Sequence, residues 1–139
     1  MPIKDFPFSN VEKDTNVYAT LNIRVINPEN GLAVTAIGII DTGATDCAFP
    51  SYFAELLGHD LKKGKCNSSQ TANGQSDVYS HTTIIEILNN KGEVVYRIPE
   101  TPIDYMQNLP IVLLGVNSFL NKFILTINYS ANIFSIQFP

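Results

Sequence analysis

Residues 32–44 of this 139-residue chain, LAVTAIGIIDTGA, are the most informative segment for predicting its fold. Residues 32–40 are nearly all apolar or β-branched, and such a run predicts a strand that is buried on both faces or nearly so. The run ends in a polar turn that contains Gly43, and loops held by a rigid strand are frequent places for functional residues. Asp41 opens this turn and has no cationic residue within several positions to neutralise it. Asp41 is therefore the first candidate for chemistry.

Short strand patterns lie on both sides of this stretch. Residues 17–25 alternate apolar and polar side chains, which is the period of a half-buried strand. Residues 61–88 are typical of a long hairpin with a polar outer half and a turn at Asn73-Gly74. Further strands are predicted at 94–98, 111–115, 123–128 and 133–138, and short helices at 50–57 and 117–122. Pro99, Pro102 and Pro110 are expected to bracket an irregular connection. Together these elements predict an all-β, barrel-like fold with one or two short helices.

Length and composition narrow the class of protein. A chain of 139 residues is one domain, and we expect a flexible N-terminal arm over residues 1–15 followed by the folded domain over 16–139. With 45% apolar and 16% charged residues, the chain is not disordered, collagen-like or a coiled coil. The net charge is −4, so nucleic acids and anionic membranes are poor partners.

Cysteines and histidines give no metal signal. The two cysteines, Cys47 and Cys66, and the two histidines, His59 and His81, have no spacing that would close a zinc site, so no metal or other cofactor is expected. Both histidines are expected to be surface or packing residues. The start of the chain has no apolar signal-peptide core, and no run of about 18 apolar residues follows, which favours a cytoplasmic location.

A second motif bears on the meaning of Asp41. Asp, Thr and Gly are ordinary turn residues, so Asp41 on its own is explained by a turn-capping Asx motif. Further along the chain, Leu113-Leu114-Gly115 would form a second buried strand that ends in glycine. Gly115 would let the backbone pass close beside the acidic turn, where a Cβ could not fit.

The ordered set of motifs resembles the retropepsin-like aspartic peptidases, the family of retroviral proteases and their cellular and bacterial relatives. The matching residues are IIDTGA at 39–44, which resembles the family's active-site turn, and LLG at 113–115. Residues 71–74 lie where the family has its flap hairpin, and Phe119-Leu120 fall in the short helix expected after the glycine. The resemblance spans residues 17–138. It implies a closed, barrel-like lobe that works as a homodimer.

The resemblance also implies an aspartic endopeptidase that acts on peptides or proteins. Hydrolysis of a peptide bond without a metal needs a base and an acid, and two carboxylates that share one proton supply both. The motif D-[ST]-G occurs once here, so the second carboxylate has to come from another copy of the chain, across an isologous interface. Two such close carboxylates do not ionise easily together, which predicts an acidic to near-neutral pH optimum.

The resemblance assigns roles within the site. Asp41 would be catalytic, Thr42 would hydrogen-bond across the two-fold axis, and Gly43 would let backbone N–H groups approach the carboxylate. The substrate-binding residues would lie on the floor and at the flap tip, where they are Ala44, Thr45, Asp46, Ala72, Asn73 and Gly74. An extended peptide would bind between floor and flaps as an added strand. Asp46 either favours a basic or polar substrate residue or is a solvated turn carboxylate.

The chain departs from the retroviral pattern at the subunit contact. Retroviral members carry Asp after D-T-G-A and Arg after the later glycine, as an ion pair that ties the subunits together. Those places hold Thr45 and Val116 here. We expect the closing strand at 133–138 to replace the pair, because an exposed apolar edge strand invites pairing with its mate. Cys47 and Cys66 would face each other between floor and flap base or, more commonly, be buried free thiols.

Two other classes of function remain open from the sequence. One is a catalytically inactive retropepsin-fold module for dimerisation or peptide binding. The other is an unrelated all-β binding barrel with a chance Asp-Thr-Gly turn. A phosphatase or ATPase is disfavoured, because the chain has neither a Gly-rich phosphate loop nor alternating strand and helix units.

Overall fold

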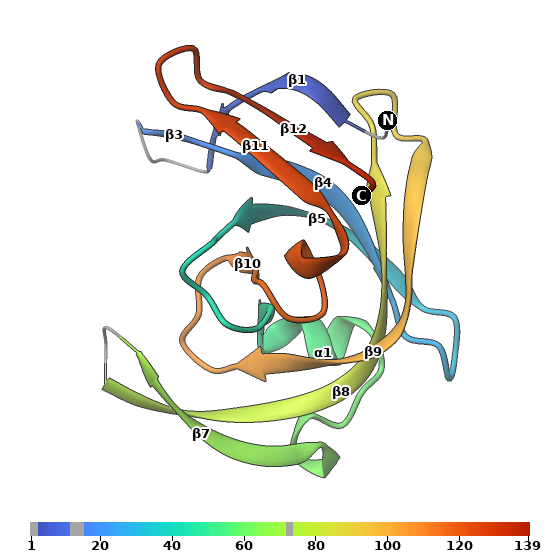
Figure 1. Cartoon of the computed structure of the whole chain (residues 1–139). Helices are drawn as coiled ribbons and strands as arrows, with labels where there is room; N and C mark the ends of the chain where they lie inside the picture. Colours follow the sequence, from blue (N-terminus) through green and yellow to red (C-terminus); the bar gives the residue numbers. More distant parts are fainter. Residues whose placement is uncertain (1–2, 12–15, 72–73) are drawn as a thin grey trace.

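A computed structural model describes residues 3–11, 16–71 and 74–139 of the chain (Figure 1). Its main sheet has strands in the order β4 (Thr20–Ile26), β5 (Ala33–Ile40), β10 (Val112–Leu114), β6 (Ala48–Pro50), β9 (Val94–Met106), β8 (Gly74–Leu88) and β7 (Lys65–Thr71). Because β8 also pairs with β4, every strand of this sheet except β7 belongs to a closed ring. The predicted all-β, closed, barrel-like lobe is confirmed.

The pairing of β5 with β10 fixes the geometry that matters for the site. These two strands run parallel, with Leu114 opposite Ile40. They pack so closely that a Cβ built on Gly38 would lie 2.8 Å from Cδ1 of Leu114. Since parallel strands end at the same edge of a sheet, the residues that follow β5 and β10 emerge side by side.

Strand β5 differs from its prediction in burial. The apolar run was expected to be buried on both faces, but exposed and half-buried residues alternate along its first part, and Ile37 is 48% exposed. The short strand β10 reaches only the last three residues of β5, beginning at Gly38. A run of apolar residues therefore does not reveal where the covering strand begins.

Strand β9 also corrects the sequence analysis. The strand was expected to end at Ile98, but it continues through Pro99 and Pro102. In the pairing of β8 with β9, Ile85 lies opposite Ile98 and Thr83 lies opposite Thr101. The register therefore shifts between these two pairs, and Pro99 falls in the resulting bulge. A bulge leaves residues outside the hydrogen-bond ladder, where proline's missing N–H does no harm.

The predicted long hairpin is confirmed as β7 and β8, and Figure 1 shows its outer end projecting from the barrel. Thr71 pairs with Gly74, while Ala72 and Asn73, the predicted centre of the flap tip, lie outside the described residues. Short helices precede the hairpin: α1 (Tyr52–Leu56) and the 3₁₀ helix η1 (Leu61–Lys63). No helix in the described part of the chain is long and apolar enough to span a membrane.

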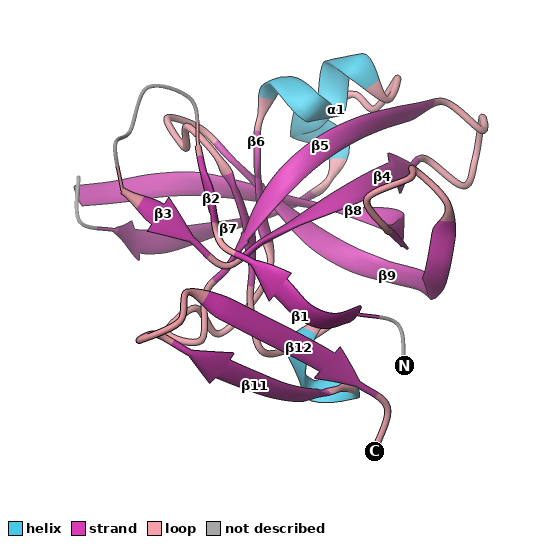
Figure 2. Ribbon diagram, turned by 90° about the horizontal axis from the view of Figure 1, so that it is seen from above, coloured by secondary structure: helices cyan, strands magenta, loops and turns pink. Residues whose placement is uncertain are grey.

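A second, three-stranded sheet joins the two ends of the chain (Figure 2). It has the order β1 (Ile3–Pro7), β12 (Ile133–Gln137) and β11 (Ile124–Asn128), and the 3₁₀ helix η2 (Leu120–Lys122) leads into it. Between β1 and β4 in the sequence, β2 (Ser9–Asn10) and β3 (Val17–Tyr18) form a separate two-stranded antiparallel sheet.

This sheet overturns two expectations. Residues 3–10, expected to be part of a flexible arm, form paired strands, and Phe6 packs edge-on against Phe134 with ring centroids 5.7 Å apart. The closing strand was expected to be an open edge, but β12 has β1 on one side and β11 on the other. It therefore has no free edge with which to pair with a second copy.

Candidate active site

Asp41 lies directly beyond the last residue of β5 and is held there by backbone hydrogen bonds. Its N–H donates to the carbonyl oxygen of Leu114 (3.1 Å), and Ala44 N–H donates to the carbonyl oxygen of Asp41 (3.1 Å), which closes the turn. Gly43 N–H donates to Oδ1 of Asp41 (3.0 Å). This last contact is an Asx turn and is also the N–H contact that the family resemblance implies. The Asp41 side chain is thus oriented by its own turn and remains partly exposed.

The chain that follows β10 packs against this turn. Val116 N–H donates to the carbonyl oxygen of Ala44 (2.9 Å), and Asn117 N–H donates to that of Thr45 (2.7 Å). A Cβ on Gly115 would overlap the carbonyl group of Asp46 and would lie 2.9 Å from the carbonyl oxygen of Ala44. The prediction that Gly115 permits a close backbone approach is confirmed.

The structure brings most of the predicted site residues together. Thr42, Gly43, Thr45 and Asp46 are exposed in the turn that begins at Asp41, and Ala44 is half-buried. Gly74 begins β8 on the separate β7–β8 hairpin. The predicted floor is therefore one continuous segment, and Gly74 belongs to a different element, the β7–β8 hairpin.

Thr45 and Val116, which occupy the places of the retroviral ion pair, are neighbours here too. Two consecutive backbone hydrogen bonds, Val116 to Ala44 and Asn117 to Thr45, hold their segments side by side. Both side chains reach solvent, and Val116 is 38% exposed. An exposed apolar residue thus stands next to the acidic turn, where the retroviral pattern has an arginine.

Asp104 is a neighbour of the site that sequence reasoning missed. Strand β9 pairs with β6 in parallel, which puts Asp104 opposite Ala48 and close to Asp46. Burial, and then the Asp46 carboxylate, raise the pKa of Asp104 above its usual value. An alternating pattern through residues 94–106 would have predicted a long strand that carries Asp104, but the prolines in this segment concealed it.

Cys47 lies beneath the floor and Cys66 on the hairpin. Burial raises the pKa of the Cys47 thiol to about 11, and Asp46 and Asp104 add to this effect. A neutral, buried thiol is a poor nucleophile, so Cys47 packs rather than reacts. Cys66 is exposed in β7, and neither cysteine is in a disulfide, so the expectation of buried thiols holds for Cys47 alone.

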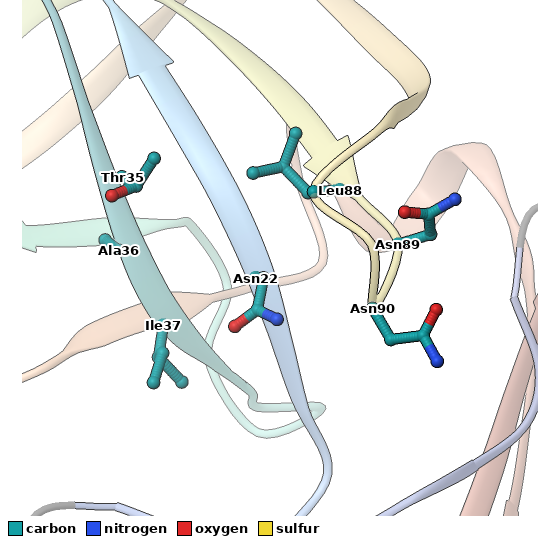
Figure 3. Close-up of a pocket in the computed structure, with 8 residues that line it drawn as sticks. Asn22, Thr35, Ala36, Ile37, Leu88, Asn89 and Asn90 are labelled. Carbon is teal, nitrogen blue, oxygen red and sulfur yellow. The ribbon is translucent and has the colours of Figure 1, made fainter.

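Within the described residues, no group of three or more His, Cys, Asp or Glu side chains could hold a metal ion. A hollow of about 380 Å³ lies away from the acidic turn, between strands β4 and β5 and the loop after β8 (Figure 3). Its polar rim includes Asn22, Asn89 and Asn90. The side-chain oxygen Oδ1 of Asn89 already accepts hydrogen bonds from the backbone N–H groups of Lys91 and Glu93 (both 2.9 Å), so this side chain serves its own turn.

Comparisons with known proteins agree with this geometry. Among solved structures, a retropepsin-like aspartic protease from Rickettsia conorii superposes with a TM-score of 0.64 at 22% identity, covering 95% of this chain and 98% of that one. The retroviral protease-like domain of Ddi1 from Leishmania major gives a TM-score of 0.51 at 16% identity, covering 85% and 88%. No curated protein matches the sequence. Residues 23–117 match the aspartyl protease family, and this segment contains both the acidic turn and Gly115. The reading of an unrelated barrel is therefore wrong, and the chain belongs to the aspartyl protease family with a retropepsin-like fold.

Proposed function

We propose that the protein is an aspartic endopeptidase that acts as a homodimer, with Asp41 of each copy forming the catalytic pair. The observation that carries this proposal is the position of Asp41 at the junction of β5 and β10, partly exposed and oriented by Gly43 N–H. One chain supplies one such carboxylate, because D-[ST]-G occurs once in the sequence. Since the chemistry needs an acid and a base, a second copy completes the site.

In the proposed mechanism the two carboxyl groups share one proton and hold a water molecule between them. The ionised carboxylate takes a proton from the water as its oxygen adds to the carbonyl carbon of the peptide bond. The protonated carboxyl gives its proton to the carbonyl oxygen, which produces a tetrahedral diol. The carboxyl group that gained the proton from water then gives it to the amide nitrogen, while the other carboxylate takes a proton from one hydroxyl of the diol. The C–N bond breaks, the acid and amine products leave, and one carboxyl group is again protonated. Thr42 would hydrogen-bond across the two-fold axis and keep the two turns in register.

The proposed substrate is an extended peptide bound across the floor. Ala44, Thr45 and Asp46 form the floor, and the tip formed by Ala72, Asn73 and Gly74 would cover the peptide from the other side. The exposed floor segment suits a ligand that adds as a strand. The nearby carboxyl groups of Asp46 and Asp104 support a preference for a basic or polar side chain beside Asp46.

A second candidate function is a retropepsin-fold module that dimerises or binds peptides without cutting. The observation that favours it is the exposed pair Thr45 and Val116, since no ion pair is available there to hold two copies together. A dimer too weak to bring two Asp41 side chains together would bind without turnover.

One experiment separates the two functions. The purified chain and its Asp41→Asn variant are incubated with a mixed peptide library from about pH 3 to pH 8, at several protein concentrations. The proposal expects cleavage that disappears in the variant and rises faster than linearly with protein concentration. Absence of cleavage from a protein shown by sedimentation to be dimeric would establish the non-cutting module.

A further inference from the structure

The two histidines of the chain lie face to face at the root of the β7–β8 hairpin. His59 follows α1 and His81 belongs to β8, and their rings are stacked with centroids 4.4 Å apart and planes 28° apart. Tyr105 of β9 packs edge-on against both, at 5.8 Å and 5.4 Å. We call these three residues the histidine cluster. It joins three segments that are far apart in the sequence.

The histidine cluster is tied to the point where the chain enters the hairpin. His81 Nε2 lies 2.8 Å from the carbonyl oxygen of Leu61 in η1, two residues before Lys63 ends that helix. A Cβ on Gly64 would lie 2.7 Å from His81 Nε2 and would overlap the carbonyl oxygen of Ser80. Figure 1 shows the chain running from α1 to the start of β7 beside β8. Any separation of the two rings would therefore loosen the base of β7.

The environment of His59 disfavours a positive charge. Its Nε2 atom is buried and has no hydrogen-bond partner among the described residues, while Nδ1 lies 3.5 Å from the Asn27 amide nitrogen, itself a donor to Leu57. Burial, and then His81, lower the pKa of His59 below its ordinary value, and the Glu29 carboxylate opposes them. Desolvation thus outweighs the single carboxylate that faces the ring.

The other titratable groups around the cluster do not supply a counter-charge. Tyr105 is fully buried, burial raises its pKa to about 12, and its hydroxyl lies 2.8 Å from that of Thr83, so it stays neutral. Asp60, the next residue after His59, is 3.9 Å from the Lys63 ammonium group. Two imidazolium rings at the observed spacing would repel each other at short range.

We propose that the histidine cluster is an acid-operated latch that holds the root of the flap hairpin while the two rings stay stacked and releases it when His59 takes up a proton. This inference rests on the proposed function, because it assigns a regulation to the same site. A separated His59 takes up a proton at a higher pH than a stacked one, so acid favours the open state. Stability that the stack contributes is present above about pH 6.5 and is lost as the pH falls through the lowered value. The hairpin would then loosen in the acidic range where a shared proton on two carboxylates is available.

Hydrogen exchange of the β7 and β8 amides tests the latch without any need for cleavage. The Asp41→Asn chain is compared at about pH 7.5 and pH 5 with the same chain carrying His59→Phe, with rates corrected for the intrinsic effect of pH. Phe keeps a ring against His81 and Tyr105 but cannot be protonated. We expect the protection of residues 65–71 and 74–80 to fall in acid. The fall should be about tenfold for each unit by which the pKa of His59 in the separated state exceeds that in the stacked state. In the His59→Phe variant the protection should fall much less.

Two further measurements keep the outcome clear. Lys91→Gln, an exposed change beyond the far end of β8, should behave as the parent chain does. If His59→Phe does not fold, His59→Gln replaces it, because glutamine is neutral over the same range. NMR titration of the chain's two imidazoles should give a midpoint for His59 below about 6.5. An ordinary midpoint for His59, or an equal loss of protection in the parent and the His59 variants, would overturn the latch and leave the peptidase proposal untouched.

Discussion

At the scale of single residues, the floor of the site is defined by contacts that leave no room for change. Gly115 touches the carbonyl groups of Asp46 and Ala44, and Asp41 is held by Leu114 and Gly43. The sequence could predict these features, because a backbone segment can pass close beside the acidic turn only where its residue has no Cβ, and Gly115 is such a residue. Asp104 and the histidine cluster could not be predicted, because their partners are brought near only by the pairing of β6, β8 and β9.

Gly115→Ala should damage the floor. The added Cβ would overlap the carbonyl group of Asp46, so the backbone has to shift, at a cost of about 1–3 kcal/mol in unfolding free energy. Peptidase activity should fall more steeply than stability, since Val116 and Asn117 anchor the acidic turn. Urea unfolding and a peptide assay measure the two effects. Gly92→Asn is the control, because Gly92 has φ +80 with no atom nearby, and asparagine tolerates that conformation. Unchanged activity in Gly115→Ala would contradict the described floor.

Asp104→Asn should stabilise the protein at neutral pH. The folded chain raises the pKa of Asp104, so ionisation of this group works against folding, and its effect grows as the pH rises above the unfolded value of about 3.9. The variant should therefore melt at a higher temperature than the parent at pH 7 and at nearly the same temperature at about pH 3.5. Asp77→Asn, an exposed carboxylate on the hairpin, should show no such difference. Equal melting of parent and Asp104→Asn at both pH values would refute this account.

At the scale of secondary structure, strand positions follow from the sequence, but strand ends and neighbours do not. The alternation in residues 17–26 and the closing hairpin at 124–137 were predicted close to their observed places. Strand β9 was predicted too short, since a proline in a bulge is indistinguishable in sequence from one that ends a strand. Strand β12 was wrongly predicted to be an open edge strand. Its partner β1 comes from the opposite end of the chain, and this pairing is not visible in the sequence around β12.

Glu86→Gln should weaken the barrel where β4, β8 and β9 meet. Glu86 is buried, accepts a hydrogen bond from Arg24 Nε (2.7 Å), and lies 3.6 Å from Arg97 Nη1. Removing its charge leaves two guanidinium groups without their carboxylate, and we expect a loss of about 2 kcal/mol or more in unfolding free energy. Urea unfolding measures it, with the exposed Glu93→Gln as the matched control. A loss no larger than that of the control would show that these strands do not depend on the ion pairs.

At the scale of the whole molecule, the barrel presents one acidic turn, and the proposed activity requires two. Figures 1 and 2 show the turn between β11 and β12 on the same side of the molecule as the outer end of the β7–β8 hairpin. Strand β12 is covered on both edges, so the proposed contact between copies would lie elsewhere. Thr45 and Val116 are candidates for it, because they stand beside the turn that begins at Asp41.

Introducing a charge pair at these two positions tests whether they lie at the proposed subunit contact. Backbone hydrogen bonds hold the segments of Thr45 and Val116 side by side, so the double variant Thr45→Asp with Val116→Arg brings two opposite charges near each other, whereas each single variant adds an unmatched charge. An exposed pair contributes about 0.2–1 kcal/mol, so the double variant should dimerise up to about fivefold more tightly than either single variant. Sedimentation across a concentration series gives the three dissociation constants. Identical constants would place the contact between copies away from this floor.

Mixing active and inactive copies of the chain tests whether two Asp41 side chains share one site. The parent chain is held at fixed concentration while about a tenfold excess of Asp41→Asn is added, with subunit exchange verified by differently tagged copies. If each site needs Asp41 from two copies, cleavage per parent chain should fall to about a tenth, because most parent chains then pair with an inactive one. Cleavage that stays constant while exchange proceeds would show that a single copy is sufficient, and the account of a shared pair of carboxylates would be wrong.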